Sequence, residues 1–253
     1  MLNYVEYGKE NKYDDDIFFQ KYSQMSRSQQ GLAGAGEWET LRKLLPDFKD
    51  KRVLDLGCGY GWHCIYAMEH GASSVVGVDI SHKMLEVAKE KTHFPQVEYK
   101  CCAIEDVEFP EESFDVILSS LAFHYVADYE ILVKKIYRIL KSGGNLVFTV
   151  EHPVFTAYGT QDWYYNEKGE ILHFPVDNYY YEGKRTAVFL GEKVTKYHRT
   201  LTTYLNTLLS NGFIINHIVE PQPPENMMDI PGMQDEMRRP IMLIVSANKK
   251  VDR

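Results

Sequence analysis

The sequence lacks three features that would assign it to a particular class of protein. No apolar run approaches the roughly 18 residues of a membrane-spanning helix, and the opening MLNYVEYGKENKYDDD lacks the basic-then-apolar pattern of a secretory signal. Positive charge is also scarce, because 28 Lys and Arg face 36 Asp and Glu, for a formal net charge of -8. A nucleic-acid footprint needs a basic face. We therefore expect a cytoplasmic protein with neither a membrane nor a nucleic-acid partner.

Cysteine is scarce as well, and the spacing of the cysteines argues against a disulfide-bonded or zinc-binding fold. The four cysteines are Cys58, Cys64, Cys101 and Cys102, and none belongs to a Cys-x-x-Cys pair. Such spacing is typical of free thiols in a reducing compartment rather than of a disulfide framework or a zinc site. We expect these side chains to be small or buried fillers, and we expect no metal site.

Strand and helix patterns, by contrast, alternate from about residue 50 onward. Helices are expected around 60–71 and 82–92, and where Leu132, Ile136, Ile139 and Leu140 recur at helical spacing. Ser81 is the predicted N-cap of the second helix, and Lys141 with Gly143-Gly144 should end the third. This alternation predicts an α/β fold whose parallel sheet is covered by helices on both faces. Its five strands are expected at 52–57, 74–80, 96–102, 114–120 and 145–150.

Four segments follow from the same reading. Residues 1–48 contain helical pieces that we interpret as a lid, and 49–151 form the sheet-and-helix core. A Tyr-rich insert at 152–198, with turn signals typical of a hairpin, should form a small cap after the fifth strand. Residues 199–253 carry a helix and two late strands joined without a helix, which predicts an antiparallel pair at one sheet edge.

The first strand ends in VLDLGCGYGWH, where Gly57, Gly59 and Gly61 stand at alternate positions. Glycines after a buried strand allow the backbone to approach a ligand closely. The dinucleotide fingerprint needs a third glycine where this chain has Trp62, which argues against a nicotinamide oxidoreductase. Asp55 and Asp79 end buried strands, where an unpartnered carboxylate is costly. We therefore expect both to have functional partners, with Asp79 suited to ribose hydroxyls.

Together these stretches resemble the motifs of class I S-adenosylmethionine-dependent methyltransferases. VLDLGCGYG resembles the first motif and VVGVDIS the second, IEDVEFPEESFDVILSSLAFHYV resembles the stretch through strand four, and ILKSGGNLVFTV the segment into strand five. The resemblance covers about residues 50–150 and is strongest for small-molecule enzymes of the ubiquinone-biosynthesis type (methyltransferase type 11). It implies a Rossmann-like, seven-stranded, mostly parallel sheet with an antiparallel C-terminal edge strand. It also implies S-adenosylmethionine as cofactor and S-adenosylhomocysteine as product.

The resemblance further implies a cofactor site at the carboxyl ends of the strands. Asp55 would take the amino group or fix the loop, and Asp79 the ribose. Ala103 stands where relatives often place an Asp for the adenine, so that contact is missing or moves to Glu105 or a backbone carbonyl. Apolar members of the set could equally be plain core. The full set expected at the cofactor is Tyr22, Arg27, Asp55, Gly57, Cys58, Gly59, Gly61, Asp79, Ile80, Met84, Ile104, Glu105 and Ser119.

Three residues are candidates for the catalytic region. His124 follows the fourth strand, and Glu151 and His152 follow the fifth. Methyl transfer from a sulfonium mainly requires alignment and exclusion of water, so a base is needed only if the acceptor must lose a proton. His124 could instead be a structural histidine bonded to the next helix.

The acceptor is expected to be a small molecule, bound by a monomer or homodimer. Amino-methylating nucleic-acid enzymes carry Asn/Asp-Pro-Pro-Tyr/Phe where this chain has Ser119-Ser120-Leu121-Ala122. A methyltransferase acting on a macromolecule is therefore a weaker alternative. The other alternative is a non-catalytic or regulatory protein that binds S-adenosylmethionine.

Overall fold

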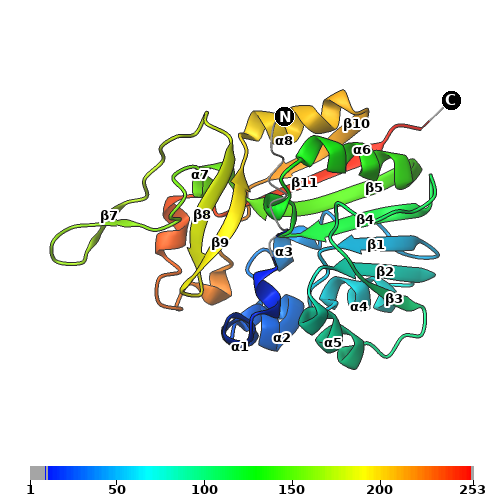
Figure 1. The fold of residues 1–253 in the computed structure, drawn as a ribbon, viewed down its shortest axis with the longest axis horizontal. Helices are drawn as coiled ribbons and strands as arrows, with labels where there is room; N and C mark the ends of the chain where they lie inside the picture. Colours follow the sequence, from blue (N-terminus) through cyan, green and yellow to red (C-terminus); the bar gives the residue numbers. More distant parts are fainter. Residues whose placement is uncertain (1–8, 10, 252–253) are drawn as a thin grey trace, which may run out of the picture.

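The fold is built around a seven-stranded sheet in the order β10-β11-β5-β4-β1-β2-β3, in a computed structural model that describes residues 9 and 11–251 (Figure 1). Strands β1 to β5 pair in parallel. Strand β11 runs antiparallel to both of its neighbours, β5 and β10. The expected mostly parallel sheet is confirmed, with the antiparallel strand set between β5 and the edge strand β10. The strands are β1 (Arg52–Leu56), β2 (Ser74–Asp79), β3 (Val97–Cys101), β4 (Phe114–Ser120), β5 (Leu140–Glu151), β10 (Phe213–Val219) and β11 (Met242–Lys249).

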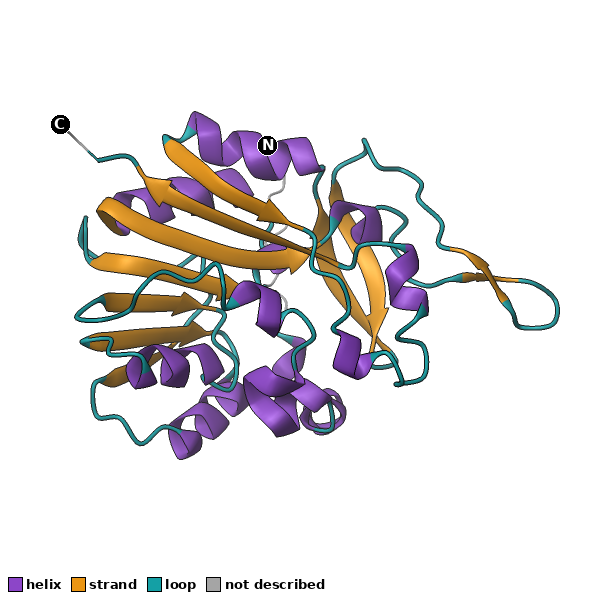
Figure 2. Cartoon of the chain, turned by 180° about the vertical axis from the view of Figure 1, so that it is seen from behind, coloured by secondary structure: helices purple, strands orange, loops and turns teal. Residues whose placement is uncertain are grey.

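Helices cover both faces of the sheet, which gives the chain two apolar cores (Figure 2). Successive side chains of a strand point to opposite faces. Leu54 and Leu56 of β1 therefore join the core beneath α6 and α8, while Val53 joins the core beneath α3, α4 and α5. These helices are α3 (Trp38–Leu41), α4 (Trp62–Glu69), α5 (His82–Lys91), α6 (Tyr129–Ile139) and α8 (Leu201–Ser210). In the described part of the chain, no helix is long and apolar enough to cross a bilayer.

Helix boundaries follow the expected capping with one exception. The Ser81 side chain accepts a hydrogen bond from the Met84 N–H, which confirms the predicted N-cap of α5. Helix α6, however, ends at Ile139, and β5 begins at Leu140 rather than near 145. The expected stop at Lys141 and Gly143-Gly144 is wrong because Leu140 adopts an extended backbone and pairs with Phe114 at the start of β4.

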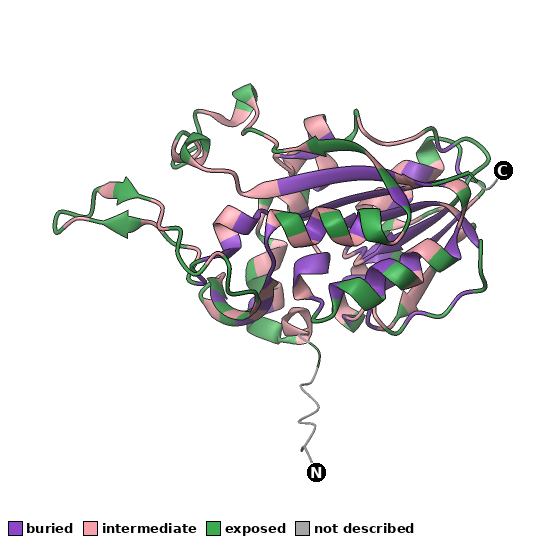
Figure 3. Ribbon diagram, turned by 90° about the horizontal axis from the view of Figure 1, so that it is seen from above, coloured by how far each residue is buried: buried purple, intermediate pink, exposed green. Residues whose placement is uncertain are grey.

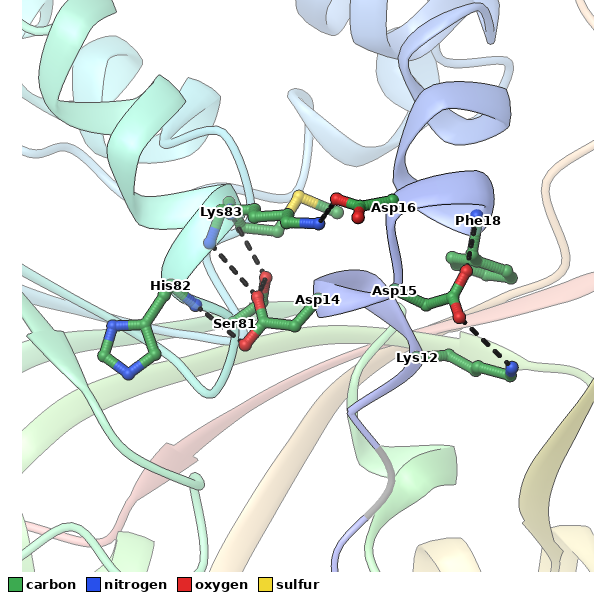
Figure 4. A network of polar contacts seen from close by, with 9 residues as sticks. Lys12, Asp14, Asp15, Asp16, Phe18, Ser81, His82 and Lys83 are labelled. Carbon is green, nitrogen blue, oxygen red and sulfur yellow. Dashed lines mark hydrogen bonds and ion pairs between the residues drawn. The ribbon is translucent and has the colours of Figure 1, made fainter.

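Short helical pieces precede the sheet, as the sequence predicts. They are η1 (Lys12–Asp14), α1 (Asp16–Ser23), α2 (Ser26–Gln30) and η2 (Gly31–Gly34). The Asp14 carboxylate fixes this segment to the N-terminus of α5 by accepting hydrogen bonds from the Ser81 hydroxyl (2.6 Å) and the Lys83 N–H (3.1 Å) (Figure 4). Burial alone would raise the pKa of Asp14, but these hydrogen bonds lower it below its usual value. The segment thus supplies a second cap to a core helix.

The insert after β5 folds as short helix α7 (Pro153–Thr156) and two hairpins, β6 (Tyr164–Tyr165) with β7 (Ile171–His173) and β8 (Gly183–Phe189) with β9 (Glu192–His198). The predicted hairpin is confirmed. Hairpin β8–β9 lies beside the ends of the central strands, whereas β6–β7 projects away from the body and is mostly exposed (Figure 3). Between β10 and β11 the chain forms η4 (Glu225–Met227) and η5 (Asp235–Arg238).

Candidate functional site

A cavity of about 370 Å³ opens at the carboxyl ends of the parallel strands, where ligands of open α/β sheets bind. Its wall combines residues that follow β1 to β5 with residues of the N-terminal segment and of the cap. Eleven of the residues expected from the sequence line it, namely Tyr22, Arg27, Gly57, Gly59, Asp79, Ile80, Met84, Ile104, Glu105, His124 and Glu151. Five expected residues, Asp55, Cys58, Gly61, Ser119 and His152, do not.

The three glycines of the loop after β1 are required for different structural reasons. All three have positive φ, at +79° for Gly57, +52° for Gly59 and +75° for Gly61. A Cβ on Gly57 would overlap Ala122, and one on Gly61 would overlap the Tyr99 hydroxyl. A Cβ on Gly59 would meet no atom within 4 Å, because this residue faces the cavity. Only the middle glycine therefore leaves space that a bound ligand can fill.

Asp79 links this loop to the ligand space. One carboxylate oxygen accepts the Gly59 N–H (2.8 Å) and the other accepts the Ser81 N–H (2.9 Å). The two carboxylate oxygens together have about four acceptor sites, so the group can still accept hydrogen bonds from ribose hydroxyls. Burial raises the pKa of Asp79 above its usual value, although both backbone hydrogen bonds oppose that shift.

Asp55 lies behind the loop rather than in the cavity. Its side chain is 1% exposed, and one oxygen lies 3.5 Å from the Cys64 thiol of α4. Burial raises the pKa of Asp55 to about 7. The expected direct contact between Asp55 and the amino group of a cofactor is not supported by this placement. Ser119 is likewise turned inward and donates its hydroxyl proton to the Leu56 carbonyl (2.8 Å).

The side of the cavity beyond β2 and β3 is apolar, which suits contact with the flat ring of an adenine. Ile80, Met84 and Ile104 line it together with Ala103. The Glu105 backbone carbonyl already accepts a hydrogen bond from the Lys135 ammonium (2.6 Å). At this end of the cavity, the carboxylate of Glu105 is therefore the acceptor group of that residue that remains for a ligand.

The N-terminal segment closes the cavity from outside the sheet. Tyr22, Met25 and Arg27 line it. One guanidinium nitrogen of Arg27 lies 2.8 Å from both carboxylate oxygens of Glu37, which is 3% exposed, so the positive charge is already paired. Trp62, which replaces the third dinucleotide glycine, packs against Gly31 of the same segment.

The opposite end of the cavity holds a buried ion pair that the sequence reading missed. The Lys196 ammonium of β9 lies 2.5 Å from the Glu151 carboxylate of β5, and Gln161 bonds both groups, at 2.5 Å to Glu151 and 2.9 Å to Lys196. Burial opposes ionisation of Glu151, but His124 and Lys196 outweigh it and lower its pKa. Val194 and His198 share the buried face of β9 with Lys196. A lysine at a buried position of an alternating strand pattern indicates a buried charge that needs a partner, and this is the pattern in the sequence that points to the ion pair.

The two candidate histidines lie in different places. His124 lines the cavity, is 2% exposed, and its Nδ1 accepts the Glu151 N–H at 3.4 Å. Burial lowers its pKa to about 4, so at neutral pH the ring is uncharged and carries its proton on Nε2. His152 instead caps α7 by accepting the Val154 N–H, and its Nε2 lies 2.8 Å from Glu220. That placement favours a structural role for His152.

This arrangement fits S-adenosylmethionine. The ligand carries no phosphate, and the cavity offers open space at Gly59, a carboxylate with free acceptor sites at Asp79 and an apolar wall around Ile80 and Met84. When bound, such a cofactor supplies a methyl group on a sulfonium centre.

Known proteins share both the sequence pattern and the fold. The profile of the family described as "Methyltransferase domain" matches residues 54–148. A structure described as an S-adenosylmethionine-dependent methyltransferase from Listeria monocytogenes is 58% identical, with a TM-score of 0.83, over 87% of this chain and 99% of that one. One from Mesorhizobium loti is 40% identical, with a TM-score of 0.80, over 87% and 100%.

A ubiquinone biosynthesis O-methyltransferase from Coxiella burnetii is 35% identical over 112 residues, which is 44% of this chain and 47% of that enzyme. That similarity spans only about half of either protein, whereas the two solved structures match nearly throughout. The cofactor is S-adenosylmethionine, and the chain belongs to the class I S-adenosylmethionine-dependent methyltransferases.

Proposed function

We propose that this methyltransferase acts on a small-molecule acceptor held between the ends of β4 and β5 and the cap. The observation that carries the proposal is the enclosed polar cluster of Glu151, Lys196 and Gln161, in the same cavity as Gly59 and Asp79. Lys196 is 2% exposed. An acceptor reaching this cluster must fit inside the wall, which favours a small molecule over a folded macromolecule.

The cofactor would be held by the loop, Asp79 and the apolar wall. The Gly59 backbone leaves space for it, Asp79 would accept hydrogen bonds from the ribose, and Ile80, Met84 and Ile104 would contact the adenine. Tyr22 and Met25 would cover it from the N-terminal segment. Because Arg27 is paired with Glu37, we propose that this ion pair shapes the wall, in place of the direct contact with the cofactor first expected of Arg27.

Glu151 is suited to receive a proton from the acceptor. A hydroxyl group becomes strongly acidic once its oxygen carries the new methyl group, so even a carboxylate with a lowered pKa can accept its proton. The uncharged His124 would present its Nε2–H as a hydrogen-bond donor that orients the acceptor. Lys196 and Gln161 would hold the carboxylate in position.

All four cysteines are free, which supports the expected cytoplasmic setting.

Calorimetric titration with S-adenosylhomocysteine tests the cofactor assignment. Asp79→Ala should bind it tenfold to hundredfold more weakly than wild type, because roughly 1.5–3 kcal/mol of charge-assisted hydrogen bonding is lost. Asp115→Ala is the matched control, since Asp115 also accepts a backbone N–H, from Arg52 at 2.9 Å, but does not line the cavity. Equal weakening in both variants would contradict the role of Asp79.

A screen of small-molecule acceptors for production of S-adenosylhomocysteine tests catalysis. A true acceptor should give turnover that Glu151→Gln reduces while cofactor binding is kept. Cofactor binding without turnover on any small molecule, together with methylation of protein or RNA substrates, would overturn the small-molecule assignment.

A further inference from the structure

A second cavity, of about 500 Å³, lies between the N-terminal segment, the connection from β10 to β11 and the first residues of β11. Ser26 and Glu37 contribute from the N-terminal side, and Pro221, Met227 and Met233 from the connection. Ligand pockets in proteins occupy roughly 300–1,000 Å³, so each of the two cavities is large enough to hold a ligand or part of one.

The two cavities adjoin each other beside the proposed acceptor site. Phe155, Ile241 and Met242 line both of them. Met242 also pairs with Glu151 across the β5–β11 ladder. The second cavity therefore begins one strand away from the carboxylate proposed to receive the proton.

The wall of the second cavity is apolar and carries no free charge among its described residues. Four prolines, three methionines and two isoleucines line it. Each charged residue in the wall has a partner: Glu37 pairs with Arg27 at 2.8 Å, and Glu236 with Arg239 at 2.6 Å. A charged ligand would find no free counter-charge here, while an uncharged apolar chain would be favoured.

We propose that the methyl acceptor is an elongated amphipathic molecule whose uncharged apolar tail occupies this second cavity. Its polar head lies at Glu151, and its tail runs past Met242 and Ile241 toward Met227 and Met233. The unbranched Met242 side chain can rotate to admit the tail, since methionine adapts readily to irregular spaces. This inference rests on the proposed function, because it assumes that the acceptor's reacting group sits at Glu151.

A series of 4-n-alkylphenols from ethyl to octyl, titrated by calorimetry at saturating S-adenosylhomocysteine, tests the proposal. Each buried methylene should raise the affinity about fourfold, the equivalent of roughly 0.8 kcal/mol. Met233→Trp fills the second cavity and should abolish the gain from the longer chains, and Met227→Trp should act in the same way. Met237→Trp is the matched control, because Met237 belongs to the same connection but is 49% exposed and lines neither cavity.

The outcomes separate this inference from the proposed function. A chain-length gain in wild type and Met237→Trp that is lost in Met233→Trp, with unchanged binding of S-adenosylhomocysteine, supports the tail site. The same gain in all variants, displacement of the phenols by S-adenosylhomocysteine, or no phenol binding would overturn the tail site and leave the cofactor assignment intact. Failure of S-adenosylhomocysteine itself to bind would instead overturn the assumption on which both rest.

Discussion

Replacing Gly59 by alanine should separate two roles that glycine can have in the loop after β1. Non-glycine residues in the left-handed region cost roughly 1–2 kcal/mol, and the new methyl group meets no atom within 4 Å. Stability should thus fall only by that amount, a drop in Tm of roughly 2–8 °C for a chain of this size. The methyl group would, however, enter the space assigned to the cofactor. Overpacking of about 1–3 kcal/mol corresponds to roughly 5- to 150-fold weaker binding of S-adenosylhomocysteine.

Two further variants make this prediction specific. Gly169→Ala carries the same backbone strain, since Gly169 has φ +79° and nothing within 4 Å of a Cβ, but it does not line the cavity. It should leave cofactor affinity unchanged. Gly61→Ala should lose more stability than either, because its Cβ would overlap Tyr99. Calorimetry and thermal unfolding of all three variants would test this, and wild-type cofactor affinity in Gly59→Ala would refute the reasoning.

Three other predictions concern the ion pair, the buried histidine and the N-terminal segment. Lys196→Met should destabilise the protein by about 3–5 kcal/mol because Glu151 remains buried and charged, and adding Glu151→Gln should recover most of that loss in urea unfolding. The folded-state pKa of His124, about 4, lies below the unfolded value of 6.5. The contribution of His124 to stability is therefore full above pH 6.5 and falls by about 3 kcal/mol as the pH drops through 4. His124→Gln should flatten this pH dependence when unfolding is compared at pH 7 and pH 4.5. Asp14→Ala should speed tryptic cleavage before residue 30, while Asp16→Ala, which removes only an exposed ion pair with Lys83, should not; equal cleavage would contradict the anchoring role.

Most of the sheet could be predicted because its signals are local. The run of Val53, Leu54 and Leu56 is buried on both faces, and the loop glycines mark where the strand ends. The boundary between α6 and β5 could not be predicted, because it depends on pairing between Leu140 and Phe114. A long-range pairing of this kind overrides the stop signal that two glycines give in sequence.

The part of the candidate site around Asp79 could be predicted, because a single residue at the end of one strand points to the ligand there. The site could not be predicted where contacts join distant segments. Lys196 reaches Glu151 from 45 residues away. Over the shorter separation of 10 residues, Arg27 pairs with Glu37, a contact that no local pattern indicates. Asp55 illustrates a third limit, because it lies within β1 and its side chain meets the Cys64 thiol of α4 instead of the cavity.

The position of β11 inside the sheet has a consequence for synthesis of the chain. Strand β5 spans 12 residues, and β11 pairs along its outer edge. On the ribosome, residues 152–241 must all be made before that cover exists, so a long unpaired edge stays open during translation. Such edges recruit other strands, and a nascent chain at this stage should depend on chaperones to avoid aggregation. Circular permutants in which β11 is translated directly after β5 would remove that interval.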